Sequence, residues 1–500
     1  MSINRSAFLR SAAASIATAS AVSAWPSGAD AGDAQDQVAS ASGGASLDAA
    51  KLKAAVDSVR KKHKVPGIST AFFADGQLVV ASSGVTNVAT GIDATPDAIM
   101  HIGSITKIFT ATLAMQLVDE GKLALERPVI DYLPDFHVAD PVATRTITVG
   151  ELLNHTSGID ANLLPDDGHD QETISNTIVR FGDAPQLHAP GYARSYCNAG
   201  MVVAGYLCQQ VTGTSWYDLV KQKIFGPLGL EHAVVLPEDA VLYRTSVGHY
   251  LDPASNTPTR TPLAFLPLGY SPAGSTAMMT ASDLMTFGRA HMADGVGTNG
   301  KRILSAAATA RMRDPIAPVT GPATFDCGIA WQRLGGLLHH GGGGPGIISL
   351  LVTHPASNTA VVVLTNADYG VGAVSDLVKP FVKTRLGIDT FPDPPKPSSD
   401  SKIDTARYVG VYENSSVVHE VTATAGGLSW TAYGRASYDA GSRSEHLPAQ
   451  TLVPAGDDRF LAGPSLIKFF EPMKSGAMRY LGLDLWLYQR TTAFGTPSST

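Results

Sequence analysis

The stretch His101-Ile102-Gly103-Ser104-Ile105-Thr106-Lys107 decides the fold and the chemistry predicted for this chain. An apolar segment follows it, and we expect an amphipathic helix over residues 105–125. Positions i and i+3 share one face of a helix, so the amine of Lys107 would lie against the hydroxyl of Ser104. An amine enclosed by apolar neighbours loses affinity for its proton and can act as a base. The stretch therefore predicts a serine nucleophile activated by a lysine.

The pattern Ser-x-x-Lys is weak alone, because the chain contains it at Ser58, Ser104, Ser399 and Ser465. Ser58 lies in a strongly basic helical segment, Ser399 in a proline-rich stretch and Ser465 in the C-terminal part of the chain. Only Ser104 has a glycine before it and a long apolar helix after it. The context therefore favours Ser104.

A second motif, Tyr196-Cys197-Asn198, follows the turn signal Ala189-Pro190-Gly191. A phenol beside a cationic lysine favours its phenolate form, so Tyr196 can take or relay the proton of the serine. Asn198 can donate and accept hydrogen bonds, which suits holding Lys107 or a substrate amide. The alternative is a loop tyrosine with a buried ring.

A third motif runs from His339 to Gly346 and joins two apolar segments, which indicates a strand, a tight turn and another strand. Glycines at a strand end often mark a close approach of another backbone or a ligand. His340 can point into a site beside this strand. The N–H of Gly343 can complete an oxyanion hole with the N–H of Ser104. The alternative is a glycine-rich hairpin with surface histidines.

In this order, the segments resemble the penicillin-recognising serine hydrolases: the class C β-lactamases, the D-alanyl-D-alanine carboxypeptidases, and the related esterases and aminopeptidases of peptidase family S12. The resemblance is carried by the three motifs above and by Leu152-Leu153-Asn154-His155-Thr156-Ser157-Gly158-Ile159, which is the most specific segment and looks structural. It spans residues 47–387. It implies an α+β fold, in which an antiparallel sheet is flanked by helices, with a helical subdomain and the site between them.

The resemblance also implies a role for each motif residue. Ser104 is the nucleophile, Lys107 and Tyr196 handle its proton, and Asn198 orients Lys107. The substrate-binding strand contributes His340, Gly342 and Gly343. Tyr196 is the expected base for the attack of water on the acyl-enzyme. No cofactor and no metal are implied.

One departure from the family pattern concerns His340, which occupies the place where many β-lactamases carry Lys-Thr-Gly. A permanently charged lysine and a hydroxyl, both useful for gripping a substrate carboxylate, are absent there. A histidine is charged only at lower pH unless its environment shifts its pKa. Esters, amides or peptides held through other groups therefore fit better than penicillins.

Length and composition indicate two folded domains. The chain has 500 residues, which is too long for one ordinary hydrophobic core. Its composition, with 44% hydrophobic and 16% charged residues, is that of a globular protein. We expect a flexible linker over residues 25–46, a catalytic domain over 47–387, a Pro/Ser-rich linker over 388–404 and a C-terminal antiparallel, lipocalin-like β domain over 405–500. The net charge of −7, with one short basic run at residues 60–64 interpreted as a solvated helix face, argues against nucleic-acid binding.

The N-terminus has the features of an export signal. Arg5 and Arg10 precede a small-residue, mildly apolar stretch, and Val22-Ser23-Ala24 fits a cleavage site. We expect a signal peptide over residues 1–24 and a periplasmic or secreted protein. No later segment is apolar for the length that a membrane helix needs. The three cysteines allow at most one disulfide, and the oligomeric state stays open.

The predicted function is an exported serine hydrolase that cleaves amide, peptide or ester bonds of a small-molecule or peptide substrate through an acyl-enzyme on Ser104. Three alternatives remain. One is a penicillin-binding or β-lactam-hydrolysing protein. Another is a binding or sensor module whose acyl-enzyme turns over slowly. The last is a structural or adhesive protein, for which all three motifs would be coincidental.

Overall fold

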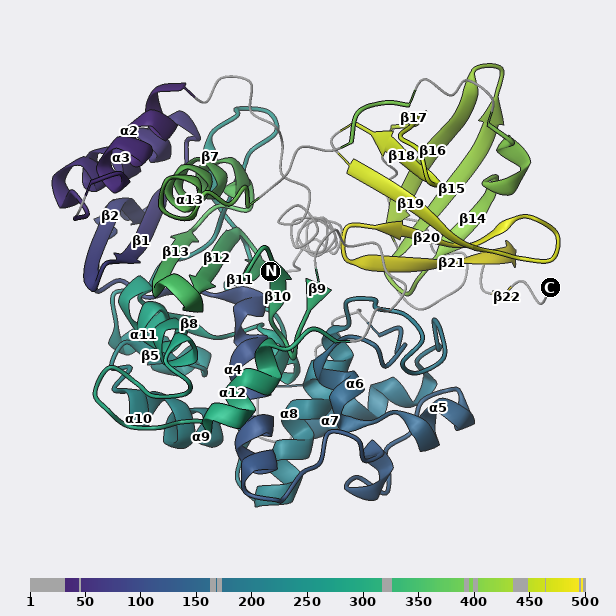
Figure 1. Ribbon diagram of the computed structural model, residues 1–500, viewed down its shortest axis with the longest axis horizontal. Coiled ribbons are helices and arrows are strands. Elements are labelled where there is room, and N and C mark those ends of the chain that lie inside the picture. Colours follow the sequence, from purple (N-terminus) through teal and green to yellow (C-terminus); the bar gives the residue numbers. More distant parts are fainter. Residues whose placement is uncertain are drawn as a thin grey trace.

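The computed structural model describes residues 32–44, 46–161, 168, 173–316, 326–390, 395–398, 403–434, 448–463, 465–493 and 496–497. The expected signal peptide, residues 1–24, lies outside the described residues. Figure 1 shows a sheet flanked by helices, a helical region beneath it, and a separate β-barrel formed by the C-terminal part of the chain. The α+β fold and the C-terminal β domain expected from the sequence are thus confirmed.

The main sheet is antiparallel and has the strand order β3-β2-β1-β13-β12-β11-β10-β9. Its first hairpin turns at Asp75-Gly76, a dipeptide typical of tight hairpin turns, and Ala74 pairs with Gln77 across it. The strands are β1 (Gly67–Ala74), β2 (Gln77–Asn87), β3 (Ile92–Asp93), β9 (Asp326–Cys327), β10 (Gln332–Leu334), β11 (Leu337–Gly344), β12 (Ile347–His354) and β13 (Thr359–Thr365).

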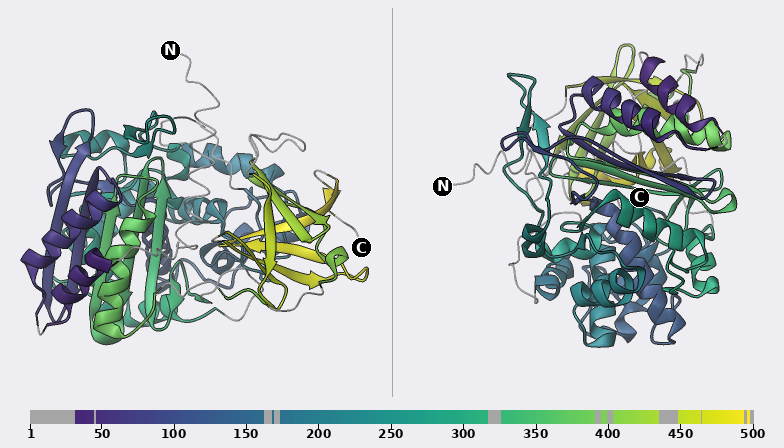
Figure 2. Two further views of the ribbon diagram at one scale, coloured as in Figure 1. Left: turned by 90° about the horizontal axis from the view of Figure 1, so that it is seen from above. Right: turned by 90° about the vertical axis from the view of Figure 1, so that its left-hand side faces the viewer.

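Both faces of this sheet are covered. Strand β1 is buried along its whole length, and its side chains alternate between two cores, as a strand requires. Phe72 belongs to the core under α2 (Gly32–Ser42), α3 (Ala49–Lys62) and α13 (Val371–Leu386), whereas Phe73 belongs to the core shared with the helical region. Figure 2 shows the two layers on opposite sides of the sheet.

Helix α2 corrects one prediction, since it lies inside the segment 25–46 that was expected to be a flexible linker. Val38 and Ala41 are buried in the core that α2 shares with α3 and α13. Gln35 donates a 2.9 Å hydrogen bond to Asp376 of α13. Alanine-rich sequence resembles a linker in composition, but alanine is the best helix former and its small side chain allows close helix packing.

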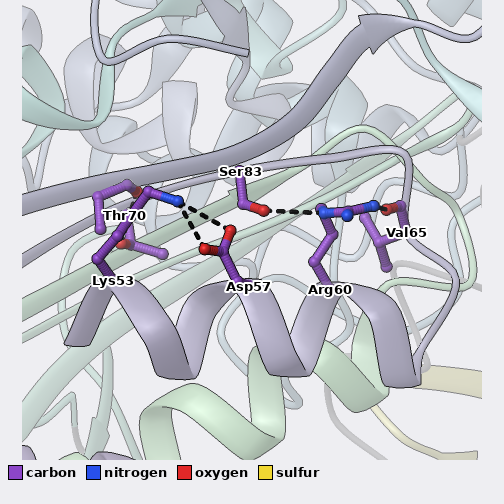
Figure 3. Close-up of polar contacts among 7 residues, drawn as sticks. Lys53, Asp57, Arg60, Val65, Thr70 and Ser83 are labelled. Carbon is purple, nitrogen blue, oxygen red and sulfur yellow. Dashed lines mark hydrogen bonds and ion pairs between the residues drawn. The ribbon is translucent and has the colours of Figure 1, made fainter. Parts of the chain in front are cut away.

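Helix α3 is fixed to the sheet by polar contacts (Figure 3). Within the helix, Lys53 pairs with Asp57 at 2.8 Å, and Arg60 donates to the hydroxyl of Ser83 on β2 at 2.8 Å. At its end, Lys62 and His63 contact the carboxylate of Asp376 at 2.9 and 2.7 Å. The basic run 60–64 is therefore partly a packing surface, not the fully solvated face that was expected.

The helix that follows Ser104 is α4 (Thr106–Asp119), and it is buried on every side from Thr106 to Leu117. The amphipathic pattern expected over 105–125 is wrong here, because α4 is the central helix of the helical region and has no solvent face. Around it lie α5 (Pro141–Thr146), α6 (Val149–Leu153), α7 (Thr173–Val179), α8 (Asn198–Thr212), α9 (Trp216–Val220), α10 (Gly226–Leu228), α11 (Ala281–Met292) and α12 (Ala306–Arg313).

The C-terminal domain is an antiparallel barrel, closed because β14 pairs with both β15 and β21. Its strands are β14 (Gly410–Glu413), β15 (Val417–Thr424), β16 (Gly427–Gly434), β17 (Gln450–Pro454), β18 (Arg459–Ala462), β19 (Ser465–Pro472), β20 (Met478–Leu483), β21 (Trp486–Ala493) and β22 (Thr496–Pro497). Ser465 and Lys468 lie on β19, where residues three apart face opposite sides of the sheet. This Ser-x-x-Lys therefore cannot form the helical pair.

The structure also bears on membrane-spanning helices and on disulfide bonds. Within the described residues, no helix is long and apolar enough to cross a membrane. The cysteines Cys197, Cys208 and Cys327 are all free.

Candidate active site

Ser104 and Lys107 lie together at the start of the central helix. Ser104 is in the short 3-10 turn η1 (Gly103–Ile105) that leads directly into α4. The Nζ atom of Lys107 lies 3.0 Å from the Oγ of Ser104 and donates a second hydrogen bond, of 2.5 Å, to the carbonyl oxygen of Ala273. The lysine is fully buried, and the serine is half-buried. The contact expected from the i, i+3 spacing is therefore present.

Glycines allow three backbone segments to meet around Ser104. A Cβ atom on Gly342 of β11 would lie 2.0 Å from the carbonyl oxygen of Ile102, and one on Gly103 would lie 2.9 Å from the nitrogen of Gly343. A Cβ atom on Gly274 would lie 2.3 Å from the carbonyl oxygen of Gly103. The glycines of the third motif thus make room for the serine turn, and they bring Gly343 beside it.

Gly342→Ala should lower kcat by about 100-fold, because the new methyl group must push the Ser104 turn and β11 apart by an appreciable fraction of an ångström. Gly426→Ala, on a barrel turn where nothing lies within 4 Å of the added Cβ atom, is the matched control and should keep wild-type kcat. Steady-state kinetics on an ester substrate check both variants. Equal kcat values for the two would contradict the close packing at the serine.

Tyr196 completes the cluster from the loop before α8. Its ring lies over the lysine, with Nζ of Lys107 4.8 Å from the ring centroid. The ring of His155 lies 4.5 Å away, and the ring of Trp486 meets it edge-on at 5.2 Å. Tyr196 is buried. The three sequence motifs thus converge, since the ring of His340 on β11 lies 6.3 Å from that of Tyr196.

The segment from Leu152 to Ile159 holds the tyrosine loop in place. It begins at the end of α6 and turns at His155, whose φ is 65°. Nδ1 of His155 accepts a 3.2 Å hydrogen bond from the N–H of Cys197, and its carbonyl oxygen accepts one of 3.0 Å from the N–H of Ser195. This geometry agrees with the structural role expected for the most specific segment of the sequence.

The barrel also reaches this loop, which sequence reasoning missed. The N–H of Tyr196 donates a 2.9 Å hydrogen bond to the carbonyl oxygen of Leu485, in the turn between β20 and β21. The N–H of Leu487 donates to the Oγ of Ser195 at 3.1 Å. No sequence pattern indicates these contacts, apart from the aromatic residue Trp486 within the predicted C-terminal β domain.

Burial determines the protonation of the lysine and the tyrosine. It lowers the pKa of Lys107 far below its usual value and raises the pKa of Tyr196, a rise that the nearby Ser104 hydroxyl only partly offsets. Burial thus favours the neutral form of both groups, and the raised pKa of Tyr196 runs against the expectation that a cationic lysine favours its phenolate. A neutral amine beside the serine hydroxyl is suited to take its proton.

His340 is neutral as well. Burial, with a smaller contribution from Lys107, lowers its pKa to about 3. Its Nδ1 lies 2.6 Å from the carbonyl oxygen of Gly341, so it carries the proton and donates. His340 therefore offers a hydrogen-bonding imidazole rather than a positive charge.

Asn198 is the first residue of α8. The hydrogen bonds of the Lys107 amino group run to Ser104 and Ala273, so in this structure a backbone carbonyl orients the lysine, a role that was expected of Asn198. Asn198 stays a candidate for substrate binding.

The lowered pKa of Lys107 should be visible in the pH dependence of kcat/KM. The base works as a neutral amine, so activity is present above the lowered pKa of Lys107 and is lost as the pH falls through it. Because that pKa lies far below 10.5, the protein should be active at neutral pH. A pH profile with a non-ionising ester measures the acid limb. His340→Asn should leave the limb at the same pH, and its disappearance in this variant would contradict the assignment to Lys107.

Known proteins resemble this chain in both sequence and architecture. The β-lactamase family model matches residues 52–378. Penicillin-binding protein 4 of Amycolatopsis lactamdurans is 35% identical over 383 residues, which cover 73% of this chain and 98% of that protein. The solved structure of SurE with D-Leu superimposes with a TM-score of 0.70 at 25% identity, over 88% of this chain and 99% of that one.

A third relative is the D-amino acid amidase of Ochrobactrum anthropi SV3, solved with L-phenylalanine amide. It has a TM-score of 0.56 and 26% identity, over 67% of this chain and 99% of its own. The family match covers more than half of the chain, and it spans the Ser104 turn, the Tyr196 loop and strand β11. This chain belongs to the β-lactamase family of serine hydrolases.

Proposed function

We propose that this protein hydrolyses amide, peptide or ester bonds through an acyl-enzyme on Ser104, as D-peptidases and esterases of this family type do. The observation that carries the proposal is the 3.0 Å contact between Ser104 and the buried amine of Lys107, whose pKa is lowered by burial. A serine hydroxyl is a weak nucleophile without a neighbouring base, and this amine is a suitable one.

The proposed reaction has two halves. Oγ of Ser104 attacks the carbonyl carbon while Lys107 takes the hydroxyl proton, and the N–H groups of Ser104 and Gly343 hold the oxyanion. The bond to the leaving group breaks as Tyr196 donates its proton to that group, and the proton on Lys107 replaces it. A water molecule then attacks the acyl-enzyme, and its proton passes through the Tyr196 hydroxyl to the neutral amine of Lys107. As the acyl bond breaks, this proton is returned to Oγ of Ser104, so that a carboxylic acid and free serine result.

Two observations support an amide, peptide or ester substrate. The third motif carries a neutral His340 in the place of a charged lysine. The relatives include a D-amino acid amidase and a structure solved with D-Leu, which supports substrates with a D-configured residue.

A pre-steady-state assay with a p-nitrophenyl ester tests the proposal. We expect a burst of nitrophenol equal to the enzyme concentration, followed by steady turnover, with the acyl group located on the peptide that contains Ser104 by mass spectrometry. D-peptides, amino-acid amides and esters are then compared by kcat/KM. An acyl group on another residue would overturn the assignment of the nucleophile.

A second candidate is a penicillin-binding protein whose acyl-enzyme persists, and the 35% identity to penicillin-binding protein 4 favours it. The lifetime of the adduct with a labelled penicillin separates this candidate from a β-lactam-hydrolysing enzyme and from the hydrolase proposed above. Rapid release of penicilloate indicates β-lactam hydrolysis, a lifetime of hours indicates a penicillin-binding protein, and the absence of an adduct supports the first proposal.

We also propose that the protein is exported and works in the periplasm or outside the cell. The support is the sequence of residues 1–24. N-terminal sequencing of the mature protein, recovered from cell fractions, should show a first residue directly after Ala24. An intact N-terminus in the cytoplasmic fraction would overturn this proposal.

A further inference from the structure

A buried hydroxyl group lies directly behind the substrate-binding strand. Ser349 is on β12, where it pairs with Gly342 of β11, and it is fully buried. Alternate residues of a strand share a face, so its side chain points the same way as that of Leu351, into the core shared with the helical region. A hydroxyl in such a core is costly unless it has a hydrogen-bond partner. None of the sequence motifs includes Ser349, and the proposed reaction gives it no role.

The partners of this hydroxyl belong to two different segments of the active site. Oγ of Ser349 donates a 2.8 Å hydrogen bond to the carbonyl oxygen of Ile102 and a longer one, of 3.3 Å, to the carbonyl oxygen of Gly342. The Ile102 carbonyl also accepts a 3.3 Å hydrogen bond from the N–H of Ile105, which closes the turn that carries Ser104. Because a serine has one O–H donor, the two carbonyl oxygens share it, and the hydroxyl ties the serine turn to β11.

Glycines bring the serine turn and β11 into direct backbone contact. A Cβ atom on Gly342 would collide with the carbonyl oxygen of Ile102 and with Oγ of Ser349. One on Gly103 would lie 2.9 Å from the nitrogen of Gly343. The spacing of the two backbones is therefore set by this contact and by the Ser349 hydrogen bond. Oxyanion donors must lie about 2.7–3.1 Å from the position of the oxyanion, so a change in this spacing weakens them.

We propose that Ser349 is a positioning residue for the oxyanion hole, because its hydrogen bond fixes the distance between the N–H of Ser104 and the N–H of Gly343. Ser349 is buried behind β11 and cannot touch the substrate, so it acts through these two donors. The inference rests on the proposed function. It implies that the hydroxyl strengthens the binding of the negative charge that develops in the transition state and leaves the binding of the substrate unchanged.

Ser349→Ala tests this role with a pair of substrates: the p-nitrophenyl ester of benzoylglycine and its thionoester, which has sulfur in place of the carbonyl oxygen. Sulfur is a weak hydrogen-bond acceptor and gains little from the oxyanion donors. In single-turnover kinetics, Ser349→Ala should lower the limiting acylation rate of the oxygen ester by about 10- to 100-fold, which is less than the loss of a whole donor. The substrate dissociation constant should not change. The acylation rate of the thionoester should stay close to that of the wild type.

Thr353→Val is the matched control on the same strand. Thr353 shares the face of Ser349, is fully buried, and its hydroxyl donates a 3.3 Å hydrogen bond to the carbonyl oxygen of Leu338 on β11. Both variants lose one buried hydroxyl that joins β12 to β11, so the unfolding temperature should fall to a similar extent. Only Ser349→Ala should change the ratio of the oxygen ester and thionoester rates. An equal loss on both substrates in Ser349→Ala, or the same change of ratio in Thr353→Val, overturns the proposal.

Crystal structures of the wild type and of both variants give a measurement that needs no turnover. We expect the backbone nitrogen atoms of Ser104 and Gly343 to lie further apart in Ser349→Ala than in the wild type. If Ser349→Ala does not fold, Ser349→Cys replaces it in both experiments, because a thiol fills the space of the hydroxyl and is a weak donor. An unchanged distance in the Ser349 variant, or the same widening in Thr353→Val, overturns the positioning role.

The two proposals fail in different ways. A wild-type protein that forms no acyl-enzyme on Ser104 with either ester overturns the proposed function. The distance between the nitrogen atoms of Ser104 and Gly343 still decides the role of Ser349 in that case, because it is measured without a substrate.

Discussion

Ser104→Ala abolishes hydrolysis, with an expected fall in kcat of about 10⁶-fold, because the nucleophile and its base act as one unit. The fold should survive. Lys107 keeps its 2.5 Å hydrogen bond to the carbonyl oxygen of Ala273, so the buried amine retains a partner, and the loss of the other hydrogen bond costs about 1 kcal/mol of unfolding free energy. Turnover of a p-nitrophenyl ester and thermal unfolding measure the two effects.

Ser465→Ala is the matched control for this variant, since it removes the serine of another Ser-x-x-Lys pattern, on β19. It should leave kcat unchanged. Wild-type turnover by Ser104→Ala would remove Ser104 from the mechanism, and a large loss in Ser465→Ala would move the site to the barrel.

Tyr196→Phe should lower kcat by about 10²- to 10⁴-fold, as the loss of a general acid–base group does. The phenylalanine ring keeps the contacts with the rings of His155 and Trp486 and the backbone hydrogen bond to Leu485. Only the hydroxyl group is lost, so thermal unfolding should stay close to that of the wild type. Single-turnover kinetics show whether acylation, deacylation or both become slower.

The control for the tyrosine is Tyr412→Phe. This residue is buried in the barrel, where its hydroxyl donates a 2.9 Å hydrogen bond to the carbonyl oxygen of Tyr408. Its replacement should lower stability by about 1 kcal/mol and leave kcat unchanged. If Tyr196→Phe turns over at the wild-type rate, another group must protonate the leaving group, and neutral His340 on the substrate-binding strand would be the next candidate.

The sequence allowed the contact of Ser104 and Lys107 to be predicted because it is local: both residues lie within one helical turn, and their spacing sets their geometry. The hairpin at Asp75-Gly76 was predictable for the same reason, since its turn residues lie next to the strands they join. The meeting of Tyr196 and His340 with that pair followed only from the resemblance, because nothing in either motif indicates the distance between them.

The remaining features could not be predicted, since they depend on long-range packing. The burial of α4 on all faces follows from its central position, which its own pattern does not reveal. The neutral forms of Lys107 and Tyr196 follow from how deeply both are buried. The contact of Leu485 with the tyrosine loop depends on how two domains dock, and no short segment encodes it.

The docking of the barrel also has a consequence for the timing of biosynthesis. Ser195 and Leu487, which hold the tyrosine loop to β21, are separated by 292 positions along the chain. A ribosome completes the catalytic domain long before it makes the strand that clamps Tyr196, and contacts of such sequence separation form late in folding. A nascent, truncated or proteolytically clipped polypeptide would retain Ser104, Lys107 and the hydrogen bonds from His155 to the tyrosine loop, but it would lack the two hydrogen bonds that the barrel adds. We therefore expect an incomplete chain to position Tyr196 less firmly than the full-length protein does, so that the last strands of the barrel complete the site.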